Sequence, residues 1–197
     1  MDWSVVGVTF VTLLVIMDPV GAAPIFVSLT RDFPPQGRRR AALRAAAAAG
    51  GVVLLFALAG DAILRYLDVS IHSVEIAGGL LLLLLSLEML RGIDFEAGPG
   101  GDVALVPLAS PLVAGPGAIA TAMVLARQHG STSGRAAVVV GIVAAVAVIG
   151  LTLLAAEFLT RRVPPAAVQF LTRVLGLLLA AIGVELVLRG IHGAFPG

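Results

Sequence analysis

The sequence contains no cysteine and no lysine, and it is poor in charged residues of either sign. Without cysteine the chain can form neither a disulfide nor a thiolate metal site. Its three histidines, His72, His129 and His192, lie far apart in sequence, so no metal site is expected. Charged residues make up 13% of the 197 residues, too few to build a water-soluble surface.

Apolar residues are what the sequence has instead, at 59% of the chain. The apolar runs are continuous, as from Leu80 to Leu85, and do not alternate as strands of a membrane barrel would. The sequence therefore predicts an all-α membrane protein, with six transmembrane helices in a single domain over 1–197. Six stretches are long enough to span a bilayer, namely 4–30, 38–66, 71–91, 104–127, 134–160 and 167–190.

The first apolar stretch has no basic residue before it and is too long for the core of a secretory signal, so we expect it to persist as the first span. Every one of the 13 basic residues is arginine, and a cluster of them falls in or near the first loop. If the spans alternate, the side reached by the first, third and fifth loops carries most of the arginines. The positive-inside rule then places the first loop in the cytoplasm and both termini outside.

The arginine cluster does not indicate a nucleic-acid partner. It consists of Arg31, Arg38, Arg39, Arg40 and Arg44, without interleaved aromatic residues, and the net charge of the chain is only +1. The partner expected at these positions is the lipid bilayer.

The chain divides into two similar halves, 1–92 and 104–197, joined by a glycine-rich linker at 92–103. The segment from Asp18 to Pro24 matches the segment from Ser110 to Pro116, with both prolines in register at an offset of 92 residues. The third spans also match, since a glycine precedes a glutamate by nine residues in each. Three spans per half is an odd number, so the pattern predicts a 3+3 inverted repeat, an architecture of many secondary transporters.

The matched Pro-x4-Pro segments predict that the first and fourth helices are broken at membrane depth. Each proline lacks an N–H group and frees a carbonyl one turn earlier, and the neighbouring glycines leave helical geometry readily. The N-termini of half-helices suit a carboxylate, whereas freed carbonyls suit an ammonium group. Together they suit a zwitterion such as an amino acid. The candidate substrate-binding residues are Asp18, Pro19, Gly21, Ala22, Pro24, Ser110, Pro111, Gly115, Pro116 and Gly117.

Asp18 is the most informative of these residues, because it falls near the middle of a predicted span. A carboxylate at that depth costs a few kcal/mol and indicates a functional site. Three roles stay open: Asp18 could pair with a substrate ammonium group, carry a coupling proton, or cap the half-helix that begins at Pro19. Its counterpart Ser110 is neutral, and the small residues nearby also suit plain helix packing.

The remaining acids in the spans have simpler interpretations as helix-end ion pairs. Their spacing from arginines is three or four residues, which places both partners on one helix face. Glu88 and Glu185 also stay candidates for a gate. The predicted pairs are Asp61 with Arg65, Glu88 with Arg91, Glu157 with Arg161, and Glu185 with Arg189.

Three segments, 17–30, 106–119 and 77–80, resemble the motifs of the MarC family, and the likeness runs over essentially the whole chain. The resemblance implies a six-helix protein of the bacterial or archaeal inner membrane. The family includes SnatA-type transporters of small neutral amino acids and looks related to the lysine-exporter superfamily. Ala22 and Ala23 stand where the family is expected to carry a bulkier or polar residue, often asparagine. The matching residues are Asp18, Pro19, Gly21 and Pro24 in the first motif, and Pro111, Gly115, Pro116 and Gly117 in the second.

The sequence thus predicts a secondary transporter of small neutral amino acids such as glycine or alanine, working by alternating access at a midplane site. We expect no cofactor, and coupling to H⁺ or Na⁺ stays open. An enzyme is disfavoured, since the chain lacks His-Glu-x-x-His, Gly-x-Ser-x-Gly and an aspartate pair at membrane depth. The alternatives are a transporter or channel for another small solute or ion, and a non-transporting membrane scaffold. The direction of transport and association into a homo-oligomer are not readable.

Overall fold

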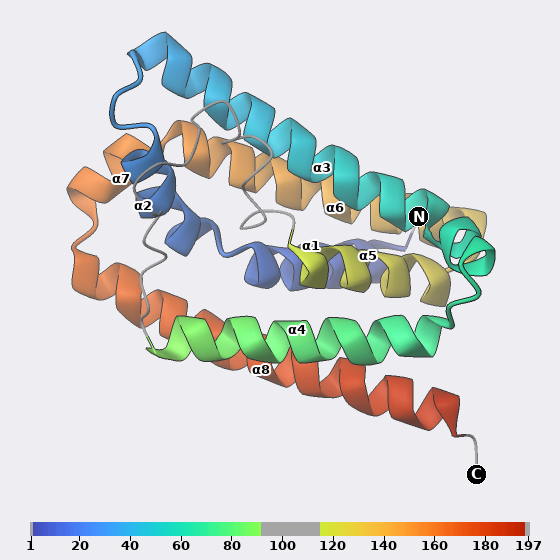
Figure 1. The fold of residues 1–197 in the computed structure, drawn as a ribbon. Helices are drawn as coiled ribbons and strands as arrows, with labels where there is room; N and C mark the ends of the chain where they lie inside the picture. The colour runs from blue at the N-terminus through green and yellow to red at the C-terminus, as the bar shows by residue number, and fades with distance from the viewer. Residues whose placement is uncertain (1, 92–114, 196–197) are drawn as a thin grey trace.

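A computed structural model describes residues 2–91 and 115–195, and every regular element in these two ranges is an α-helix (Figure 1). Several helices begin with proline at their first residue, where the missing N–H would have no partner in any case. The helices are α1 (Trp3–Met17), α2 (Pro19–Leu29), α3 (Pro35–Tyr66), α4 (Ile71–Arg91), α5 (Pro116–Gln128), α6 (Thr132–Leu154), α7 (Ala156–Arg162) and α8 (Pro165–Ala194).

Four of these helices, α3, α4, α6 and α8, are each long and apolar enough to cross a membrane. The pair α1 and α2 passes the same test together, although the two are bent by 42° at their junction, and would be a fifth span. An all-helical protein with four or five candidate spans is therefore confirmed. The predicted span 104–127 is described only from Gly115 onward, so its length stays a prediction. The predicted span 134–160 is not one helix, since α6 ends at Leu154 and α7 begins at Ala156.

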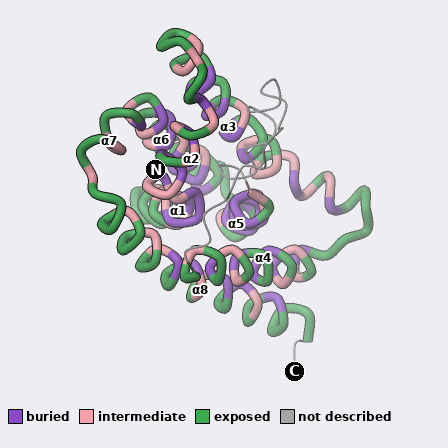
Figure 2. The backbone as a smooth tube through the Cα atoms, turned by 60° about the vertical axis from the view of Figure 1, so that its left-hand side comes forward, coloured by how far each residue is buried: buried purple, intermediate pink, exposed green. Residues whose placement is uncertain are grey.

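The helices lie lengthwise beside one another, with α1 and α5 in the middle of the bundle (Figures 1 and 2). The pair α4 and α8 covers one side, and α3 and α6 cover the other. Nearly every residue of α5 from Gly117 to Ala126 is buried, whereas the outer helices expose leucine and phenylalanine on their outward faces. This arrangement suits lipid as the surrounding solvent.

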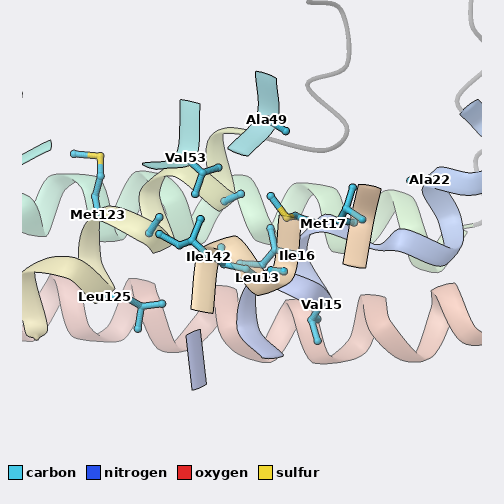
Figure 3. Close-up of a cluster of buried hydrophobic side chains, with 14 of the residues drawn as sticks. Leu13, Val15, Ile16, Met17, Ala22, Ala49, Val53, Met123, Leu125 and Ile142 are labelled. Carbon is cyan, nitrogen blue, oxygen red and sulfur yellow. The ribbon is translucent and has the colours of Figure 1, made fainter. Parts of the chain in front are cut away.

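The core lies where the outer helices meet α1, and it is built mainly from aliphatic side chains and methionines (Figure 3). Five helices each contribute a side chain with no exposed surface, so the core ties the whole bundle together. These are Leu13 of α1, Val53 of α3, Leu82 of α4, Ile142 of α6 and Leu179 of α8.

Glycine lets α4 and α8 approach closely. Gly176, Gly183 and Gly190 are spaced seven residues apart on α8, and all three are buried. A Cβ atom on Gly183 would lie 2.9 Å from the carbonyl oxygen of Gly79, and one on Gly190 would lie 2.8 Å from that of His72. The start of α4 therefore meets the end of α8, so the two helices run antiparallel. Such contacts between backbones stabilise helix pairs in lipid, where the hydrophobic effect does not.

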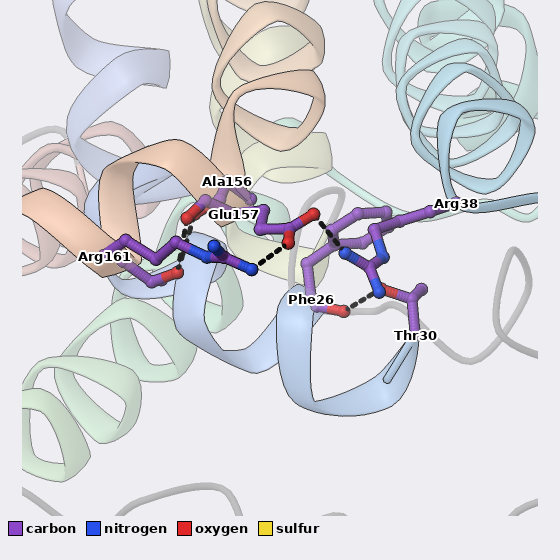
Figure 4. A network of polar contacts seen from close by, with 7 residues as sticks. Phe26, Thr30, Arg38, Ala156, Glu157 and Arg161 are labelled. Carbon is purple, nitrogen blue, oxygen red and sulfur yellow. Dashed lines mark hydrogen bonds and ion pairs between the residues drawn. The ribbon is translucent and has the colours of Figure 1, made fainter. Parts of the chain in front are cut away.

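Two clusters of ion pairs join α3 to the second half of the chain. Near the start of α3, Arg38 binds Glu157 of α7 (Figure 4). Near its end, Asp61 binds Arg127 at 3.3 Å and Arg135 at 3.6 Å. Arg38 and Asp61 are separated by about 35 Å along the helix, at about 1.5 Å per residue. The two clusters therefore lie at opposite ends of the bundle.

Two of the four ion pairs predicted within single helices are present, Glu157 with Arg161 and Glu185 with Arg189, each at 2.7 Å. The prediction for Asp61 with Arg65 is wrong, because Asp61 binds arginines of α5 and α6 instead. Glu88 makes no ion pair among the described residues. A pair within one helix contributes only a few tenths of a kcal/mol, so a cation from a neighbouring helix readily replaces it.

We predict that Gly183→Ala lowers the stability of the protein by about 1–3 kcal/mol, since its methyl group meets the α4 backbone. The matched control is Gly51→Ala, because a Cβ on Gly51 has no neighbour within 4 Å. Alanine favours the helix over glycine, so the control should be neutral or stabilising. Heat unfolding in detergent, followed by circular dichroism, measures both variants. Equal melting temperatures would contradict the close contact of α4 and α8.

Candidate functional site

The junction of α1 and α2 is a single residue, Asp18, with φ 37° and ψ 72°. This left-handed conformation is rare outside glycine, and aspartate and asparagine are among the side chains that tolerate it. Asp18 ends α1 and also precedes the first turn of α2. Pro19 follows at the first helical position, where its fixed φ suits a helix start. α1 and α2 thus meet at Asp18, one residue before the first proline, while a break of the first span at membrane depth stays a prediction.

The carboxylate of Asp18 folds back over the start of α2. The Oδ1 atom accepts a hydrogen bond from the Gly21 N–H at 3.0 Å. The backbone carbonyl oxygen of Asp18 accepts a second one from the Ala22 N–H at 2.9 Å. Any Cβ on Gly21 would overlap Oδ2 of the same carboxylate. Gly21 is therefore needed for this cap, and the predicted capping role of Asp18 is realised in the structure.

Thr172 of α8 brings a hydroxyl group to the same place. A Cβ on Gly21 would lie 3.4 Å from Thr172 Oγ1, and the hydroxyl faces the Asp18 carboxylate. This oxygen is buried and makes no hydrogen bond of ordinary geometry with any described residue. Sequence reasoning missed Thr172. The available signal was its position, 97 residues after Glu75, because the same offset relates Gly79 to Gly176.

The other predicted residues of the first motif differ in their surroundings. Pro19 and Ala22 are buried, and Gly21 is half-buried. Pro24 is exposed and lies inside α2, which continues through it to Leu29. Within the Pro-x4-Pro segment, α2 is therefore not interrupted at Pro24. Pro24 lies only five residues after the first helical position. Its missing N–H group therefore leaves only one carbonyl without a partner, in the first turn of α2.

The second motif is described only in part, because Ser110 and Pro111 lie outside the described residues. Gly115 precedes α5 in an extended conformation, and Pro116 is the first residue of that helix. Gly117 is buried, and a Cβ on it would overlap Leu82 of α4 and lie 4.0 Å from Ile16 of α1. The start of α5 therefore lies against the end of α1, two residues before Asp18.

The structure thus brings the N-termini of α2 and α5 to one region of the bundle interior, beside a carboxylate and a buried hydroxyl. The first-turn amides carry partial positive charge and can bind an anionic group. Asp18 can bind a cationic group or a proton. Among the described residues no group of three or more acids and histidines is placed to hold a metal ion.

A comparison of the sequence with protein families gives a match to the model for MarC family integral membrane proteins over residues 3–195. The chain is 37% identical to the UPF0056 membrane protein MJ1677 of Methanocaldococcus jannaschii, over 98% of this chain and 99% of that protein. It is 34% identical to the UPF0056 inner membrane protein YhgN of Escherichia coli, over 92% of this chain and 93% of that protein. It is 29% identical to the UPF0056 membrane protein YvbG of Bacillus subtilis, over all of this chain and 98% of that protein.

No solved structure is significantly similar to the chain. The family model and the relatives agree with one another and with the helical bundle described above, and each of them covers nearly the full chain. The chain belongs to the MarC family of integral membrane proteins.

Proposed function

We propose that the protein is a secondary transporter of small neutral amino acids, which bind at the junction of α1 and α2 beside the start of α5. The observation that carries this proposal is the Asp18 turn, which holds a carboxylate inside the bundle at a helix start. A zwitterion needs both charges matched, and this region offers amides for its carboxylate and Asp18 for its ammonium group.

The substrate should be small. Gly21 and Gly117 have no room for even a Cβ atom, and Ala22 is fully packed. A ligand here must occupy space close to backbone atoms, which suits glycine or alanine better than a long side chain. Thr172 adds a hydroxyl that can hydrogen-bond either end of such a ligand.

An inverted 3+3 repeat is part of the proposal, and the ion pairs support it. The pair Arg38–Glu157 joins the start of α3, the second helix of one half, to α7, which directly follows α6 of the other half. Arg135–Asp61 makes the reciprocal connection at the opposite end of the bundle. Arg38 corresponds to Arg135 at an offset of 97 residues, and Asp61 corresponds to Glu157 at an offset of 96 residues. The two pairs thus occupy matching positions in the two halves.

The contact of α4 with α8 has the same symmetry. Gly79 packs against Gly183, and Gly176 packs against Ser86. With an offset of 97 residues, Gly79 corresponds to Gly176 and Ser86 corresponds to Gly183. Each contact therefore has the other as its equivalent in the proposed repeat. Two halves related in this way can exchange roles, which supports alternating access around a site between them.

The arginine-rich start of α3 should face the cytoplasm, with both termini outside. One relative is named an inner membrane protein, which supports the inner membrane as the location. Two other functions remain as outcomes of the tests below: a carrier or channel for a different small solute or ion, and a scaffold without transport.

The direct test is counterflow of labelled glycine and alanine into proteoliposomes of the purified protein. We expect labelled glycine to accumulate transiently against internal unlabelled glycine or alanine, while a bulky amino acid such as tryptophan should not compete. Protein-free liposomes are the control. Absence of both counterflow and gradient-driven uptake would contradict amino-acid transport.

Asp18→Asn tests the carboxylate. Asparagine tolerates the left-handed turn and can cap α2, so folding should be retained. Loss of a charge-assisted hydrogen bond of about 1.5–3 kcal/mol to the ammonium group should weaken glycine binding by about tenfold to a hundredfold. The apparent KM of counterflow measures this change. Retained exchange without response to a proton gradient would instead indicate a proton site, and unchanged transport would leave Asp18 as a cap alone.

Cross-linking tests whether the ends of α3 move. The chain has no cysteine, so the double variant Arg38→Cys, Glu157→Cys carries two thiols on a thiol-free background. A flexible bifunctional maleimide joining them should block transport, whereas each single-cysteine variant treated identically should stay active. Undiminished transport after complete cross-linking would argue against separation of α3 from α7 during the cycle.

A further inference from the structure

Glu75 is the single charged residue that is buried among the described residues. The residue is 7% exposed, whereas the other buried polar residues are threonines and a serine. It lies on α4, one of the helices long and apolar enough to cross a membrane. A buried acid in such a helix indicates a functional site. The spacing of acids and arginines gives no hint of Glu75, because no arginine lies three or four residues from it.

The side chain of Glu75 points into the bundle. Residues three and four positions apart share a helix face, and Gly78 and Gly79 follow Glu75 at these spacings. A Cβ on Gly78 would meet Ala120 of α5, and one on Gly79 would meet Gly183 of α8. Glu75 therefore lies where α4 packs against α5 and α8, and it faces away from lipid.

Its charged partner is His72. The His72 Nδ1 and Glu75 Oε2 atoms lie 3.2 Å apart, and the side chains are 38% and 9% exposed. His72 is near the first residue of α4, and a Cβ on Gly193 of α8 would overlap its imidazole ring. The ring thus extends from the exposed end of the helix to a buried carboxylate. An imidazole ring can both accept and donate a proton, so it can pass a proton between water and the acid.

The other charged groups near this end of the helices packed on α4 are engaged elsewhere. Arg127 of α5 binds Asp61, and Arg189 of α8 binds Glu185. His192 of α8 contacts the carbonyl oxygen of Leu188 at 2.8 Å. No arginine within the described residues neutralises Glu75, and a charge without such a partner is costly in the bundle interior. Proton uptake removes that charge.

The repeat connects Glu75 to the proposed substrate site. Glu75 and Thr172 are 97 residues apart, the same offset that relates Gly79 to Gly176. Thr172 is the residue of α8 whose hydroxyl faces the Asp18 carboxylate. The equivalent position on the third helix of each half thus carries an inward polar group, a hydroxyl on α8 and a carboxylate on α4.

We propose that Glu75 and His72 form a proton-binding site that couples proton movement to substrate transport. A proton enters from water at the start of α4, passes from the imidazole to the Glu75 carboxylate, and leaves Glu75 neutral. The proton returns to water when the opposite side opens. The inference rests on the proposed transport function, and it assigns the coupling ion to this pair.

Two assays on the same proteoliposomes separate coupling from exchange. Glycine counterflow needs no net proton movement, whereas accumulation driven by a pH gradient does. Glu75→Gln should keep counterflow close to wild type and lose gradient-driven accumulation. Glu88→Gln is the matched control, because Glu88 lies on the same helix, is exposed and has no ion-pair partner among the described residues. Gradient-driven accumulation by Glu75→Gln at the wild-type level would overturn the proposal.

His72→Gln provides a second variant at a partly exposed position, should Glu75→Gln fail to fold. It should slow gradient-driven accumulation and leave counterflow unchanged. An unchanged gradient-driven rate would overturn the role of His72. A wild-type protein that exchanges glycine but ignores a pH gradient would overturn the coupling site and leave the transport function intact. A wild-type protein without any glycine flux would contradict the transport function itself.

A spectroscopic measurement does not depend on transport. Infrared difference spectra between acidic and alkaline buffer report protonation of carboxylic acids in the detergent-solubilised protein. Glu75→Gln should lose one band of a protonated carboxyl group that the wild type and Glu88→Gln both show, and this band should be displaced in His72→Gln. Identical spectra for the wild type and Glu75→Gln would overturn the proton site.

Discussion

The interior of this bundle depends on one backbone constraint, the left-handed turn at Asp18. A helix interrupted inside a membrane leaves amides and carbonyls without partners, and lipid cannot satisfy them. Asp18 meets this need with its own carboxylate and carbonyl groups, which accept the first free amides of α2. The cap works only because Gly21 lacks a side chain. The interruption therefore puts a negative charge beside a helix N-terminus. A ligand with groups of both charges can contact the carboxylate and the helix N-terminus together.

The surrounding helices make this interruption tolerable by packing closely elsewhere. The glycine contacts of α4 with α8 and the ion pairs at both ends of α3 hold the outer helices, while α1, α2 and α5 carry the irregular geometry between them. In lipid such close backbone contacts and interhelical polar contacts supply most of the attraction between helices. The outer helices thus form a closely packed frame around an interrupted inner layer.

The sequence predicted the helical class and the membrane, because composition and the length of apolar runs act locally. It did not predict which arginine meets Asp61, because an ion pair between helices depends on how far each helix end lies from its neighbours. It overstated Pro24, since a proline near a helix start disturbs little. Thr172 and Glu75 were missed for a related reason: an isolated polar residue gains meaning only when its helix face is known.

The two halves share a backbone pattern but distribute their acids differently. Asp18 and Thr172 have Ser110 and Glu75 at the equivalent sequence positions, so each pair keeps one acid and one hydroxyl while the acid changes helix. An exact repeat of the hydroxyls would leave no group to hold an ammonium ion or a proton. Under the proposed function, the Asp18 carboxylate binds the substrate ammonium group and the Glu75 carboxylate on α4 binds the coupling proton.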